Sequence, residues 1–451
     1  MVIPIGNESW QRAGGLVFFL LSCVAVAPVH AEDLAQVYAV SKDSDPKYRA
    51  ARFDFEAAAY AEPQALAALL PNLSFEVANT STDQRILSSN NPVFASGQSK
   101  YPTDSQTLNL TQPIFKLSAW RGYAQAKAKV KQAAATFSAA EQDLMLRAAT
   151  AYLNVLAARD ALGLAQAERD AIKRQLDLVQ QQFRSGLVAI ANLHDAKARH
   201  ALKDADVVAA QNDLDDKLQA LRELTGKVFV RLKPLRESFP LEQPEPPDMN
   251  HWVEAALRQN VLLEARRQAV EVALQEMGRQ QAAHLPVLDL VATQNRKDTG
   301  GSLFGGGSNV TTVDFMLRLN VPIYSGGLTS ALTGEALKRY YSSLEDLERD
   351  ARQVERQTRA AFQGLTGGVV RAQALAQGVT SSESARELKA EGYKAGLATL
   401  LQVLDAERDL YAAKRDSAKA RYDFLLNRLR LKQAAGTLSD ADLIGINRFL
   451  Q

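Results

Sequence analysis

The chain carries two copies of one helix–turn–helix tip, about 210 residues apart. The first copy runs from Phe183 to Ala196 and the second from Tyr393 to Ala406. In each copy an aromatic residue closes a heptad-patterned run. A glycine three residues later, Gly186 or Gly396, supplies a turn where a helix does not comfortably continue. Two such tips predict two helical hairpins in one chain.

The same register holds well beyond the tips. The segment Leu108–Phe115 recurs as Leu317–Tyr324, and Leu70–Leu73 recurs as Leu285–Leu288. This self-similarity predicts a tandem duplication in which each copy runs helix, strand, loop, strand, very long helix, tip and shorter helix. The predicted organisation is a signal peptide, a first repeat, a proline-rich linker, a second repeat and a C-terminal segment: 1–31, 32–226, 227–250, 251–436 and 437–451.

The first 31 residues have the pattern of an export signal. Arg12 precedes an apolar run, Leu16–Ala27, and the small-residue site Val29–Ala31 lies before Glu32. The only cysteine, Cys23, lies inside this segment. An alternative is lipoprotein processing that leaves an acylated Cys23 as the first residue. In either case the exported chain has no disulfide to stabilise it.

The strands predicted in each repeat have one apolar face. Val313, Phe315 and Leu317 alternate with polar residues, and polar loops, predicted at Gln84–Tyr101 and Lys297–Asn309, join the paired strands. A single strand of this kind is also compatible with an ordinary half-buried soluble sheet. Strands of about ten residues with long loops at one end are the pattern of outer-membrane strands.

Four strands per chain cannot close a membrane barrel, because an open edge in lipid leaves backbone groups unpaired. We therefore expect an oligomer. Two copies would give eight strands and a filled interior, whereas three would give twelve and leave a lumen, so a transporting barrel predicts a trimer. The helix predicted from Lys116 to Gln182 would extend roughly 100 Å. Its apolar residues between Leu144 and Phe183 follow coiled-coil spacing.

Composition and motifs give little support to other functions. The chain has 53 Lys and Arg against 51 Asp and Glu, which argues against a nucleic-acid partner. The histidines lack paired metal-ligand spacing, and there is no nucleophile elbow, so we expect no catalytic, cofactor or metal site. The polar residues of interest lie near the tips, where Asp195 and Asp405 could face a symmetry axis. The alternative is that each is a first-turn acid that offsets a helix dipole.

The sequence resembles the TolC family of trimeric outer-membrane efflux and secretion ducts. The resemblance is carried by ordered segments that span nearly the whole exported chain: Asp33–Tyr38, Ala149–Leu156, Ile172–Asp177, Gly186–Ile190, His284–Leu290 and Ala420–Leu425. It implies an α+β membrane protein in which a homotrimer forms a twelve-stranded outer-membrane β-barrel. A periplasmic tunnel of twelve helices would continue the barrel, with an equatorial girdle built from the linker and the C-terminal segment.

The resemblance also implies a function. Such a chain would be an exit duct for type I protein secretion or multidrug efflux, and not an enzyme. It would work in outer-membrane lipid with a periplasmic adaptor protein and an inner-membrane ABC or proton-driven pump. The adaptor-contact tips would hold Gly186, Leu187, Gly396 and Leu397. The alternative from another class is a soluble periplasmic coiled-coil adaptor or scaffold, which would not need lipid-facing strands.

Family members close the periplasmic aperture with links among helices and line it with two acidic rings. Asp405 matches one ring, and Gln402 stands where the other acid is expected. The resemblance therefore implies three aperture carboxylates per trimer and a weaker attraction for polyvalent cations. Tyr393 matches a linking tyrosine whose expected partner here is Asn192. A second polar link is replaced by two alanines, Ala191 and Ala398.

Overall fold

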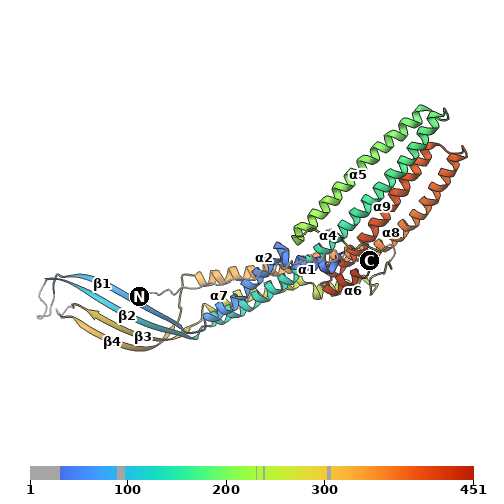
Figure 1. The fold of residues 1–451 in the computed structure, drawn as a ribbon. Helices are drawn as coiled ribbons and strands as arrows, with labels where there is room; N and C mark the ends of the chain where they lie inside the picture. Colours follow the sequence, from blue (N-terminus) through green and yellow to red (C-terminus); the bar gives the residue numbers. More distant parts are fainter. Residues whose placement is uncertain (1–30, 89–96, 230, 237–238, 302–305) are drawn as a thin grey trace, which may run out of the picture.

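The computed structural model describes residues 31–88, 97–229, 231–236, 239–301 and 306–451. The predicted signal peptide, including Cys23, lies outside the described residues except for Ala31. The described chain is elongated, with a β-sheet at one end and two helical hairpins at the other (Figure 1). Its element order runs helices, two strands and two long helices, and then the same order again with a short helix at the end.

The strands form one antiparallel sheet in the order β1-β2-β3-β4, so the prediction of four strands is confirmed. Their bounds are β1 (Asn72–Ile86), β2 (Gly97–Phe115), β3 (Val287–Thr299) and β4 (Ser308–Asn320). The register aligns the predicted apolar positions across all four strands, because Phe75 opposes Leu108 and Leu290 opposes Leu317. This apolar band is exposed in the single chain and comprises Leu73, Phe75, Val77, Leu108, Leu110, Leu290, Val313, Phe315, Leu317 and Leu319.

The strands extend further than the sequence predicted, into segments that were expected to be loops. Residues 84–86 and 97–101 of the loop expected at Gln84–Tyr101 are paired strand, and so are residues 297–299 and 308–309 of the loop expected at Lys297–Asn309. An alternating apolar pattern appears only where one face of a strand is buried. The backbone hydrogen bonds of the sheet can continue beyond that region, where polar side chains on neighbouring strands interact favourably. Asp83 opposes Lys100 in the extension. Thr103 Oγ1 lies 3.0 Å from Thr299 Oγ1 in the polar part of the β2–β3 pair.

Four long helices form the two predicted hairpins. The first hairpin is α4 (Leu117–Arg184) with α5 (Ile190–Thr225), and the second is α8 (Leu328–Lys394) with α9 (Leu400–Ala434). They lie side by side in the order α5, α4, α9, α8 (Figure 1). Among the described residues, no helix combines the length and apolar character needed to cross a membrane.

The predicted seam of α4 is buried, but α4 buries a second face that the heptad pattern did not reveal. Leu144, Val155 and Val179 of the seam are fully buried, and so are Tyr152 and Leu153, which lie outside the seam. The reason is that the segment before α1 and the linker between the repeats cover this part of α4. Tyr152 donates its hydroxyl proton toward the carbonyl oxygens of Glu32 and Lys233, at 3.2 and 2.9 Å.

Short helices surround this middle region: α1 (Leu34–Ser44), α2 (Pro46–Ala59), α3 (Ala61–Ala67), α6 (Met249–Gln259), α7 (Val261–Ala282) and α10 (Asp440–Asn447). The predicted break at Asp45–Pro46 separates α1 from α2. Asp45 accepts the backbone N–H of Tyr48 and two hydrogen bonds from Arg147, at 3.2 and 2.7 Å. Burial acts to raise the pKa of Asp45, but these hydrogen bonds hold it below its usual range.

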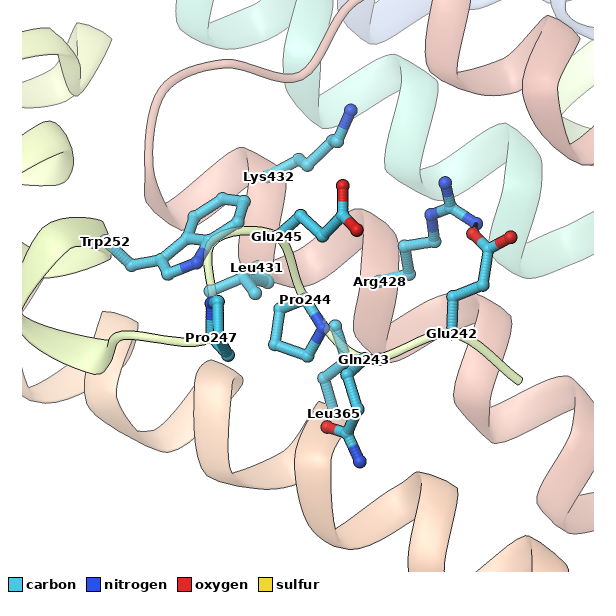
Figure 2. A pocket seen from close by; sticks show the side chains of 10 residues that line it. All are labelled: Glu242, Gln243, Pro244, Glu245, Pro247, Trp252, Leu365, Arg428, Leu431 and Lys432. Atoms are coloured by element: carbon cyan, nitrogen blue, oxygen red, sulfur yellow. Dashed lines mark ion pairs between the residues drawn. The ribbon is translucent and has the colours of Figure 1, made fainter. Parts of the chain in front are cut away.

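The proline-rich linker packs against the second hairpin near the C-terminus. It forms isolated bridges that pair Glu32 with Leu232 and Leu235 with Leu450. A cavity of about 620 Å³ lies between the linker, α6, α8 and α9 (Figure 2). Trp252 closes one side by donating its indole N–H to the carbonyl of Pro246, 2.9 Å away. This region joins the two repeats.

Candidate functional site at the hairpin tips

Both hairpin turns have the same backbone geometry. Gly186 and Gly396 have φ values of 72° and 75°, which an L side chain rarely adopts. At the first tip the N–H of Gly186 bonds to the carbonyl of Phe183, and the N–H of Leu187 bonds to that of Gln182. The second tip repeats the pattern, and these paired bonds form a Schellman motif that satisfies the last carbonyls of each long helix.

An apolar cluster joins the two hairpins just behind the turns. It contains side chains from α4, α5 and α9: Ile172, Val179, Leu193, Ala196, Leu400 and Leu404. Phe183 and Tyr393, the aromatic residues that define the sequence repeat, pack against it. Leu404 is 1% exposed, whereas its neighbour Leu401 is 52% exposed. The tips are therefore held together by packing within one chain.

The two return helices begin differently. Thr399 and Gln402 form a reciprocal capping box at the start of α9. The Gln402 N–H lies 3.3 Å from Thr399 Oγ1, and the Thr399 N–H lies 3.0 Å from Gln402 Oε1. At the start of α5 the cap residue is Ala189, which has no side-chain acceptor. Gln402, which the sequence placed at an aperture ring, thus uses its amide oxygen to cap its own helix.

The predicted hydrogen bond between Tyr393 and Asn192 is not the one that forms. The Tyr393 hydroxyl instead donates to Oε1 of Gln182, at 2.8 Å. Gln182 lies in the last turn of α4, so the bond links the ends of the two ascending helices. The family resemblance suggested a partner on the return helix, because sequence could not show how the hairpins of this chain are rotated against each other.

Asp405 also has a partner that the sequence did not predict. Arg199, on α5, places Nη2 2.9 Å from Asp405 Oδ1, and Arg408 on α9 lies 3.7 Å from the same oxygen. The helix-dipole alternative is wrong, because neither α5 nor α9 has an acid in its first turn. In the sequence, the one feature that could have pointed to Arg199 as a tip residue was its position one helical turn after Asp195.

A second ion pair lies one turn further from the tip. Lys203 on α5 bonds to Glu168 on α4, with 2.9 Å between Nζ and Oε1, and to Asp206, with 3.0 Å. Burial acts to lower the pKa of Lys203, but the hydrogen bonds to these carboxylates raise it above its ordinary value. Glu168 is only 5% exposed. The ion pairs therefore continue along α5 toward the middle of the hairpin.

The remaining predicted tip residues differ in exposure. Leu187 and Leu397 project into solvent, with 74% and 86% of their surface exposed. Ala191 and Asp195 are exposed, whereas Asn192 and Ala398 are half-buried. The two tips together present exposed leucines. Next to them lie the polar side chains that link the helices, which are Tyr393 with Gln182, Arg199 with Asp405, and Lys203 with Glu168. In the described part of the chain, no group of three or more His, Cys, Asp or Glu side chains is placed to hold a metal ion.

Comparisons with known proteins agree with this architecture. The sequence profile of the family described as outer membrane efflux protein matches residues 37–227 and 252–437. The outer membrane protein TolC of Escherichia coli K12 is 34% identical over 434 residues, covering 93% of this chain and 85% of that protein. The proteases secretion protein PrtF of Dickeya chrysanthemi is 27% identical, covering 98% and 96%.

A solved structure shows the same fold at lower identity. The CmeC outer membrane channel of Campylobacter jejuni superposes with a TM-score of 0.80 at 15% identity, covering 99% of this chain and 98% of that one. The sequence match selects the exit-duct hypothesis over the soluble adaptor, and the family is one of transport channels rather than an enzyme class. The chain belongs to the outer membrane efflux protein family.

Proposed function

We propose that three copies of this chain close a twelve-stranded barrel in the outer membrane and continue it as a helical tunnel. By its family the chain is an outer-membrane channel that serves efflux and type I secretion. The single observation that supports the trimer is the sheet. Its four strands expose one apolar face, and its outer strands β1 and β4 each pair on only one side in the described chain.

The physical argument for closure is the cost of an open edge in lipid. Each unpaired backbone group there costs several kcal/mol, so β4 of one copy must pair with β1 of the next. Twelve strands leave a lumen, whereas eight are filled by their own side chains. The apolar band then faces lipid, and the polar positions between its residues face the lumen.

The hairpin tips are proposed as the periplasmic aperture and the docking point of the adaptor protein. Leu187 and Leu397 are exposed on glycine turns, so a partner protein can bury these two apolar side chains without changing the helices behind them. The cross-links from Tyr393 and Asp405 lie just inside and would hold the tips together. The partners are a periplasmic adaptor and an inner-membrane ABC or proton-driven pump. Proteins or small toxic compounds would be the cargo.

The sheet assignment is tested by placing the same charge on either face of β4. Leu317→Arg should abolish most of the folded trimer, because Arg on the lipid face near the midplane costs about 2 to 4 kcal/mol. Met316→Arg is the matched control, since Met316 is its neighbour, is also exposed in the single chain and points to the other face. The measurement is the amount of heat-sensitive trimer in outer-membrane fractions. Equal loss in both variants would contradict the assignment of faces.

A further inference from the structure

We propose that Arg199 is a selectivity-determining residue of this channel, because it occupies the Asp405 carboxylate and keeps polyvalent cations from binding there. This inference rests on the proposed function, in which the tips line the aperture. It reverses the expectation from sequence that three Asp405 carboxylates form a free anionic ring. The geometry on which it rests is a contact between α5 and α9, which belong to different hairpins.

The contact is short and partly shielded from water. Arg199 Nη2 lies 2.9 Å from Asp405 Oδ1, within the range of a charge-assisted hydrogen bond. The two side chains are 27% and 37% exposed, so neither is a freely solvated surface charge. Arg408 Nη1 approaches the same oxygen at 3.7 Å. A cation that binds Asp405 must therefore displace or pass two guanidinium groups.

Two other cations of this region, Arg408 and Lys203, have carboxylate partners of their own. Arg408 bonds to Asp409 at 2.9 Å, and this hydrogen bond, together with the nearby carboxylates, raises the pKa of Arg408. Lys203 bonds to Glu168. Arg199 is thus the residue whose charge is committed to Asp405. In a trimer, three Arg199 and three Asp405 cancel.

A ring of uncovered side-chain carboxylates is a recognised means of attracting cations in a pore. Removing Arg199 should therefore create a cation site that the parent channel lacks. The effect should be greatest at low ionic strength, since the Debye length is about 30 Å at 0.01 M salt and about 3 Å at 1 M. Asp405 itself is unchanged by the substitution. The new site should thus disappear when Asp405 is also replaced.

The experiment is a titration of channel block in planar bilayers, with hexaamminecobalt(III) added from the periplasmic side at low salt. Arg199→Gln should be blocked at a concentration at least about tenfold lower than the parent, because each of the three carboxylates loses its hydrogen-bonded guanidinium group. Arg199→Gln with Asp405→Asn should return to parental sensitivity. Arg199→Lys should behave as the parent, since it restores the charge. Lys197→Gln is the matched control, because it removes the same charge from an exposed position on the same helix.

The outcomes separate the inference from the proposed function. If the parent is blocked as readily as Arg199→Gln and Asp405→Asn alone abolishes that block, Asp405 lines the aperture unshielded and the inference is wrong. If none of the Arg199 and Asp405 variants changes block or conductance while heat-sensitive trimer persists, neither residue lies in the aperture. The aperture assignment would then fail together with the inference.

Discussion

The two hairpin tips share a turn but differ in how the helix after the turn is held. Both long helices end in a Schellman motif on a glycine with positive φ. Only α9 then starts with a capping box, whereas α5 starts at Ala189. Tyr393 links the second tip to the first through Gln182. The two tips therefore have the same local turn, but the contacts that stabilise each return helix differ.

The largest expected effect concerns packing behind the second tip. Leu404→Ala should open the start of α9, because truncating a fully buried leucine typically costs about 2 to 5 kcal/mol. Hydrogen exchange of the α9 amides should then accelerate by roughly 30-fold or more, at tenfold per 1.4 kcal/mol. Leu401→Ala is the control, since Leu401 is half-exposed. If the control accelerates exchange equally, the apolar cluster does not anchor α9.

The capping difference predicts effects of opposite sign at the two tips. Thr399→Ala should destabilise the first turn of α9 by about 1 kcal/mol, because it removes the hydroxyl that accepts the backbone N–H of Gln402. Ala189→Ser should stabilise the first turn of α5 by a similar amount. Exchange rates of the first-turn amides measure both changes. Faster exchange in α5 of Ala189→Ser would show that this helix start is fixed by something other than its cap.

The smallest effect is expected for the tyrosine link. Tyr393→Phe removes one hydrogen bond, for a loss of about 0.5 to 1.5 kcal/mol in tip stability, and should raise single-channel conductance if the bond helps closure. A double-mutant cycle decides the partner. Gln182→Leu should be coupled to Tyr393→Phe, and Asn192→Leu should be additive with it. Coupling to Asn192 instead would restore the partner expected from sequence.

The difference between local and long-range contacts explains which features of the fold could be predicted from the sequence. The repeat at about 210 residues, the glycine turns and the break at Asp45–Pro46 were predictable, because each depends on residues that are close in sequence. The apolar faces of the four strands were predictable for the same reason. Strand ends were not, because a pair such as Asp83 and Lys100 stabilises the ladder without giving an alternating pattern.

The sequence by itself determined that this chain forms two glycine-tipped helical hairpins and one-sided strands, and its resemblance to a family gave the function. Only the tertiary structure decided which side chains meet at the tips. Arg199 reaches Asp405, and Tyr393 reaches Gln182, through the rotation and axial offset of α4, α5, α8 and α9. Heptad spacing predicts one buried face of a helix, but further buried faces and the offset between neighbouring helices depend on the packing of their side chains.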